Sequence, residues 1–93
     1  MQPKSGHIEL SVIIPTFNEE GNIALLIQRL EATMLGIGCT AYEYIFIDDG
    51  STDRTLEVMN NLRHRFPKDI HVLPLRTNVG KGEAVRAGFN FAF

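Results

Sequence analysis

The sequence of 93 residues lacks several features that would assign it to particular classes of protein. Its one cysteine, Cys39, excludes a disulfide framework within the chain and a CxxC metal site, and indicates a reducing compartment. A net charge of −2 without blocks of like charge argues against nucleic acid as the main partner. No apolar run approaches the ~20 residues that span a bilayer, and residues 1–7 do not read as a signal peptide. We therefore expect a cytoplasmic chain that meets a membrane only through regions outside it.

The composition is that of an ordinary globular protein, with 44% hydrophobic and 22% charged residues. A chain of this length forms one domain at most. We expect that domain to cover residues 8–93 and residues 1–7 to be a disordered tail.

Segments in which apolar residues have the spacing of a strand alternate along the chain with segments that have the spacing of a helix. Short apolar, β-branched runs predict strands, and apolar residues at helical spacing predict helices. The strands are expected at 8–14, 42–47 and 70–75, and the helices at 22–35, 53–65 and from 81 onward. Pro15 is expected to end the first strand, Asn22 or Gly21 to cap the first helix, and Ser51 or Thr52 to cap the second. This β-α-β-α-β-α order predicts an α/β fold with three α-β-α layers around a parallel sheet.

Three polar segments follow the three predicted strands, where ligands bind in such sheets. The first, at 15–20, reads Pro-Thr-Phe-Asn-Glu-Glu. Its backbone N–H groups and the Thr16 hydroxyl could bond a polar ligand, and a base could stack on Phe17. Taken alone, the segment is better explained as a plain loop in which Phe17 covers the edge of the core.

The second segment, at 48–53, reads Asp-Asp-Gly-Ser-Thr-Asp. The adjacent carboxylates of Asp48 and Asp49 repel one another, which is costly unless a ligand uses them. They could accept a hydrogen bond from a base N–H or help to hold a divalent cation, and Gly50 would allow a tight turn beside the ligand. The alternative is that one aspartate only organises the turn.

The third segment, at 76–82, combines glycines, a predicted helix N-terminus and Lys81, which together suit a phosphate. It is neither a Walker loop nor a dinucleotide fingerprint, because the required glycines and the Ser or Thr after the lysine are absent. Alone, it is better explained as a flexible turn with a solvated lysine.

Together, the segments at 11–20, 47–53 and 78–88 resemble glycosyltransferase family 2. Asn-x-Gly-Lys-Gly at 78–82 is most similar to the branch that acts on polyprenyl phosphates, such as the dolichyl-phosphate mannosyl- or glucosyltransferases. The resemblance implies a GT-A fold, a UDP- or GDP-linked sugar donor with UDP slightly favoured, Mg²⁺ or Mn²⁺, and an acceptor that is a polyprenyl phosphate. It also implies the nucleotide-binding residues, which are Pro15, Thr16, Phe17, Glu19, Asp48, Asp49, Gly50, Asn78, Gly80 and Lys81.

Within that set, Pro15 to Phe17 would line the base, and Phe17 stands where the family usually has tyrosine. Asp49 would accept the base N–H. The family continues into an Asp-x-Asp strand that holds the cation and a later acidic base, both expected beyond Phe93. We therefore expect nucleotide binding without turnover, no catalytic residue and no certain metal ligand in this chain.

The apolar surface at Phe89, Phe91 and Phe93 is then expected to favour self-association. Three alternatives stay open: a non-catalytic nucleotide-binding module, a sugar-nucleotide pyrophosphorylase-like domain, and a scaffold without affinity. Pyrophosphorylases favour a glycine-rich loop after the first strand, where this chain has residues 15–18.

Overall fold

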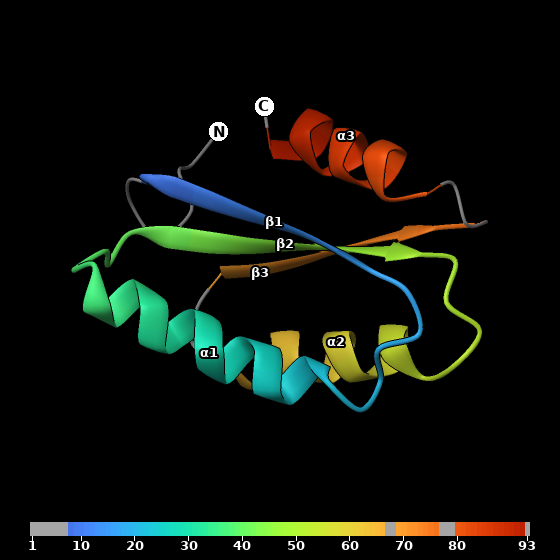
Figure 1. Ribbon diagram of the computed structural model, residues 1–93, viewed down its shortest axis with the longest axis horizontal. Helices are drawn as coiled ribbons and strands as arrows, with labels where there is room; N and C mark the ends of the chain where they lie inside the picture. The colour runs from blue at the N-terminus through green and yellow to red at the C-terminus, as the bar shows by residue number, and fades with distance from the viewer. Residues whose placement is uncertain (1–7, 67–68, 77–79, 93) are drawn as a thin grey trace.

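The computed structural model describes residues 8–66, 69–76 and 80–92 (Figure 1). The tail expected at 1–7 and Asn78 lie outside these residues. The elements follow the predicted order: β1 (Leu10–Thr16), α1 (Ile23–Gly36), β2 (Tyr42–Asp49), α2 (Thr55–Arg65), β3 (Asp69–Leu75) and α3 (Lys81–Ala92). No helix among the described residues is both long and apolar enough to cross a membrane.

The three strands form one parallel sheet in the order β1-β2-β3. All eight residues of the central strand β2 are buried, as expected for a parallel strand covered on both faces. Figure 1 shows α1 and α2 on one face of the sheet and α3 on the other. The predicted three-layer α/β architecture is confirmed.

Each face of the sheet has its own core. The larger cluster, under α1 and α2, comprises Ile23, Ile27, Met34, Tyr42, Tyr44, Phe46, Met59 and Ile70. The smaller cluster, under α3, comprises Ile45, Ile47 and Ala84 with partly buried neighbours. Helix α3 exposes Val85, Phe89 and Phe91, of which Phe91 also contacts the His71 ring of β3 at 5.4 Å between ring centroids. The exposure of both phenylalanines agrees with expectation, Phe93 lies outside the described residues, and self-association stays a prediction.

The expectation that Pro15 ends the first strand is wrong. Pro15 lies inside β1 and pairs with Ile47, and Pro74 likewise lies inside β3. Both strands are edges of the described sheet, and an edge strand tolerates proline because one row of its N–H groups has no ladder partner.

Two tyrosines of β2 and one carboxylate of α1 form a hydrogen-bonded cluster. The Tyr42 and Tyr44 hydroxyls both donate to Glu31 Oε2, at 2.7 and 2.6 Å. Burial and the Glu31 carboxylate raise the pKa of Tyr42 to about 12, and the same two causes raise the pKa of Tyr44. The cluster therefore favours the neutral phenols.

Because of this cluster, we expect the unfolding free energy to fall at alkaline pH. A tyrosine pKa that is higher in the folded chain than the ordinary ~10 contributes stability that is fully present below pH ~10 and is lost as pH rises through the folded pKa. The chain has only two tyrosines, so tyrosinate absorbance reports on these two alone. We expect both to titrate above their ordinary pKa and the unfolding free energy to fall in that range, less steeply in Tyr42→Phe. Titration at the ordinary pKa would contradict this assignment.

Helix α3 packs closely on the sheet through small residues. Ala84 is fully buried, and a Cβ added at Gly88 would lie 2.5 Å from Ile13 Cγ2 and 3.0 Å from Ile47 Cδ1. Any larger residue at that position forces the Ile13 and Ile47 side chains or the helix itself to shift.

We predict that Gly88→Ala lowers the unfolding free energy by about 1–3 kcal/mol, because the added methyl group overpacks the smaller core. Gly82→Ala is the matched control on the same helix, since nothing lies within 4 Å of a Cβ there. That control should be neutral or stabilising by up to about 1 kcal/mol. Urea unfolding of both variants tests the claim, and equal midpoints would refute it.

Candidate functional site

The tips of β1 and β2 meet at one edge of the sheet. The two strands pair in parallel with Thr16 opposite Asp48, so the segments that follow them start side by side. A pocket of about 200 Å³ lies at this edge and is lined by Pro15, Thr16, Phe17, Glu19 and Asp49. The Phe17 side chain is largely exposed, whereas Asp49 is buried. An aromatic face and a carboxylate from two distant segments thus border one pocket.

The third polar segment reaches the same place through Asp49. The backbone N–H of Gly80 donates to Asp49 Oδ2 at 3.0 Å, and Gly80 adopts a φ of +89°, which favours glycine. Gly80 directly precedes α3, so the N-terminus of that helix lies beside the carboxylate. Lys81 opens the helix, and its side chain lies outside what the structure describes, as does Asn78.

The two aspartates do not act as a pair. Side chains alternate along a strand, so Asp48 lies on the face of Phe46 and Asp49 on the face of Ile47. Asp48 is buried, is not among the residues that line the pocket, and accepts the Ser51 N–H at 3.3 Å. Gly50, with a φ of +74°, makes the turn between Asp49 and Ser51. The structure therefore gives Asp48 the turn-organising role and leaves Asp49 at the pocket.

The fold uses the proton of the Thr16 hydroxyl. Thr16 is buried, and its Oγ1 donates to the Ile47 carbonyl at 2.9 Å and lies 3.6 Å from the Met59 sulfur. Thr16 also lines the pocket. A bond from this hydroxyl to a ligand stays a prediction, and with its proton engaged the oxygen would take part as an acceptor.

The expected helix caps are confirmed only in part: Asn22 holds the N-cap position of α1, whereas Ser51 or Thr52 as the cap of α2 is wrong. Asn22 precedes α1 without a capping bond from its side chain, and its Nδ2 donates to Glu19 Oε1 at 2.9 Å. Helix α2 starts at Thr55, whose N–H donates to Asp53 Oδ1 at 2.9 Å, and the Ser51 hydroxyl bonds the first loop instead. Partial desolvation raises the pKa of Asp53, but hydrogen bonds from Thr55 and the Glu20 N–H outweigh it and hold that pKa below its usual value.

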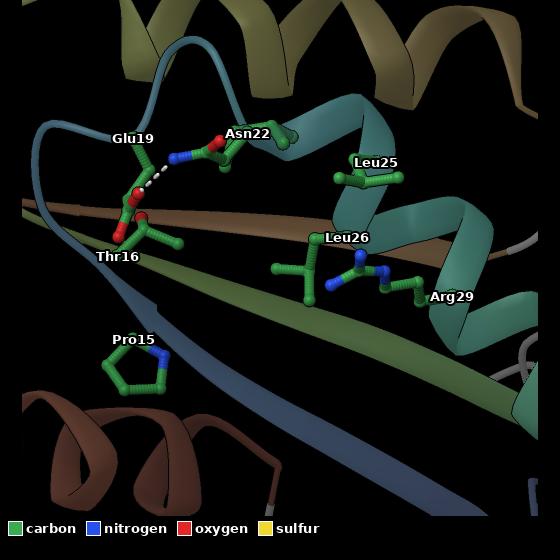
Figure 2. Close-up of a pocket in the computed structure, with 8 residues that line it drawn as sticks. Pro15, Thr16, Glu19, Asn22, Leu25, Leu26 and Arg29 are labelled. Atoms are coloured by element: carbon green, nitrogen blue, oxygen red, sulfur yellow. Dashed lines mark hydrogen bonds between the residues drawn. The ribbon is translucent and has the colours of Figure 1, made fainter.

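A second pocket, of about 240 Å³, lies on the α1 side of β1 (Figure 2). Figure 2 shows Leu25, Leu26 and Arg29 along α1 and Thr16 on β1, with Glu19 bonded to Asn22 near the helix start. Pro15, Thr16 and Glu19 line both pockets, so the two adjoin at the end of β1.

The described residues do not fit a divalent cation. Within 8–66, 69–76 and 80–92, no three His, Cys, Asp or Glu side chains gather in a way that could hold a metal ion. The placement of Asp48 and Asp49 on opposite faces of β2 explains why this adjacent pair does not act as a chelate. No chemical step is assigned to a metal here.

A parallel α/β sheet with a pocket at adjacent strand tips is the architecture of nucleotide-binding α/β proteins. The chain belongs to glycosyl transferase family 2, whose sequence model matches residues 11–93. This assignment favours the glycosyltransferase reading over the pyrophosphorylase-like alternative.

Similar proteins agree with that family. The chain is 38% identical over 80 residues to an undecaprenyl-phosphate 4-deoxy-4-formamido-L-arabinose transferase of Pseudomonas aeruginosa, covering 86% of this chain and 23% of that protein. It is 39% identical over 83 residues to the transferase of the same name from Pectobacterium carotovorum, covering 89% of this chain and 25% of that protein. The chain therefore spans about a quarter of the length of these relatives.

A solved mannosyltransferase from Pyrobaculum calidifontis, in complex with GDP-Man and Mn²⁺, has the same fold. Its TM-score is 0.79 at 20% identity, covering 99% of this chain and 27% of that one. The expected GT-A architecture is confirmed.

The contribution of the Thr16 hydroxyl hydrogen bond to stability can be tested. We predict that Thr16→Val lowers the unfolding free energy by about 1 kcal/mol, because the Ile47 carbonyl loses a buried donor. Thr33→Val is the matched control: its hydroxyl also donates to a carbonyl, that of Arg29, but on an exposed helix face where water can replace it. Urea unfolding of both variants measures the difference. If the midpoint of Thr16→Val is no lower than that of Thr33→Val, the Thr16 hydroxyl does not stabilise the fold.

Proposed function

We propose that this chain is the nucleotide-recognition part of a family 2 glycosyltransferase that takes a UDP- or GDP-linked sugar as donor. The observation that carries the proposal is that Phe17 and Asp49 border one pocket at neighbouring strand tips. A ring and a buried carboxylate together match a nucleobase, which offers a face for stacking and an N–H for donation.

The remaining parts of the nucleotide fit the surroundings of this pocket. The ribose would lie near Glu19, which lines both pockets. The diphosphate would lie toward Gly80, where the N-terminus of α3 favours negative charge. Lys81 would contribute a positive charge at the same helix end.

In the whole enzyme the reaction is direct displacement at the anomeric carbon. The acceptor oxygen forms the new bond, the nucleoside diphosphate leaves with the electron pair of the old one, and configuration inverts. The described residues bind and orient the donor, and none of them is assigned as catalytic base. We propose that these 93 residues alone bind nucleotide without turnover.

The relatives support a proposal for the acceptor, the cation and the location. Curated relatives carry undecaprenyl phosphate in their names, so we propose that the acceptor is a polyprenyl phosphate and that the whole enzyme works at the cytoplasmic face of a membrane. The fold neighbour was solved with Mn²⁺, which supports Mn²⁺ or Mg²⁺ as the cation. Such an ion would neutralise the leaving diphosphate when bound.

Calorimetric titration with UDP and GDP, with and without Mn²⁺, tests this function. We expect one of the two to bind and Phe17→Ala to weaken it by about 1–3 kcal/mol, roughly 5- to 150-fold, because base stacking is lost. Phe17→Tyr should bind at least as well as the parent chain.

Phe89→Ala is the matched control, because it removes an exposed phenylalanine from α3, on the helix's outer side. It should leave the affinity unchanged. No heat with either nucleotide would refute the proposed function and favour the scaffold alternative, and equal losses in Phe17→Ala and Phe89→Ala would refute the stacking role.

A further inference from the structure

The segments that follow β1 and β2 are joined by hydrogen bonds, each from a backbone N–H group of one segment to a side chain of the other. Side chains of the second loop accept three consecutive N–H groups of the first: Asn18 N–H donates to Ser51 Oγ (2.9 Å), Glu19 N–H to Thr55 Oγ1 (2.7 Å) and Glu20 N–H to Asp53 Oδ2 (3.3 Å). Each of these groups would otherwise need water as its partner.

The pattern is reciprocal. Asn18 Oδ1 accepts the backbone N–H groups of Thr52 (2.8 Å) and Asp53 (3.3 Å), and Glu20 Oε1 accepts that of Arg54 (3.3 Å). We name residues 18–20 and 51–55 with these bonds the loop interlock. Asn18 takes part in both directions: its backbone N–H donates once, and its side-chain Oδ1 accepts two backbone N–H groups.

Asn18 also has an unusual backbone conformation. Its φ is +52°, the one positive φ of a non-glycine residue among those the structure describes. Asparagine is one of the few residues that adopt this left-handed conformation at low cost. The conformation is needed because it turns the chain so that Asn18 Oδ1 faces the amides of the second loop.

The interlock lies directly beside the pocket. Asn18 follows Phe17, and Ser51 comes two residues after Asp49, but neither Asn18 nor Ser51 lines the pocket. Phe17 is 43% exposed, so packing covers only part of its ring. The backbone that the interlock fixes therefore contributes to the position of the ring over the pocket. A site fixed before binding loses less conformational entropy on binding.

We propose that Asn18 is a positioning residue for the nucleotide: through the interlock it holds Phe17 at the distance from Asp49 that a base requires. Asn18 acts without touching the ligand. This inference rests on the proposed function, and it adds a residue whose side chain the pocket does not include.

Two substitutions at Asn18 test its side-chain acceptor while keeping its backbone conformation. Asn18→Gly keeps the positive φ and removes the acceptor; Asn18→Asp keeps an acceptor and tolerates the same φ. We expect Asn18→Asp to bind UDP or GDP within about threefold of the parent chain and Asn18→Gly to bind about tenfold more weakly, because backbone hydrogen bonds of the interlock are lost. Ile70→Val, at the opposite end of the sheet, controls for a general loss of stability and should leave the affinity unchanged.

A double-mutant cycle tests whether Asn18 acts through Phe17. If it does, Asn18→Gly costs no further affinity in a Phe17→Ala background, because the ring to be positioned is gone. Additive losses in the cycle, or parent-like affinity in Asn18→Gly, would overturn the inference while the proposed function stands. Absence of UDP and GDP binding in the parent chain would refute both, so the two failures are distinguishable.

Discussion

The parallel pairing of β1 with β2, with Thr16 opposite Asp48, is the constraint on which the rest of the structure depends. It brings the loops after these strands together, although more than thirty residues separate them in sequence. Parallel pairing alone leaves both loops with unsatisfied backbone N–H groups. The loop interlock supplies their partners, and a pocket with an aromatic ring and a carboxylate results.

The two sides of the sheet contribute differently to that pocket. Helices α1 and α2 cover the larger core and start from the interlocked loops. Helix α3 covers the other face, held close by Ala84 and Gly88, and its start is bonded to Asp49 through the Gly80 N–H. The carboxylate at the pocket is thus fixed by one helix and the aromatic side chain by the loops of the other two.

The order of elements and the place of the site could be predicted from the sequence. The spacing of apolar residues and the polar segments that follow the strands are both local signals. What could not be read were the partners of single polar groups. Ser51 resembles a helix cap in isolation, yet it bonds Asn18 across the loops. Asp48 and Asp49 look equivalent in sequence, but alternation along β2 sends them to opposite faces. The role of Asn18 was missed, although asparagine in a loop directly after a strand is a signal for a left-handed turn with side-chain bonds to backbone.

The proposed site requires that Phe17 and Asp49 together receive a nucleobase. Backbone amide NMR during titration with UDP and GDP measures this directly. We expect shifts concentrated at residues 16–20, at Asp49 and Gly50, and at Gly80. Shifts centred instead on the opposite end of the sheet, around Glu31 and Tyr42, would contradict it.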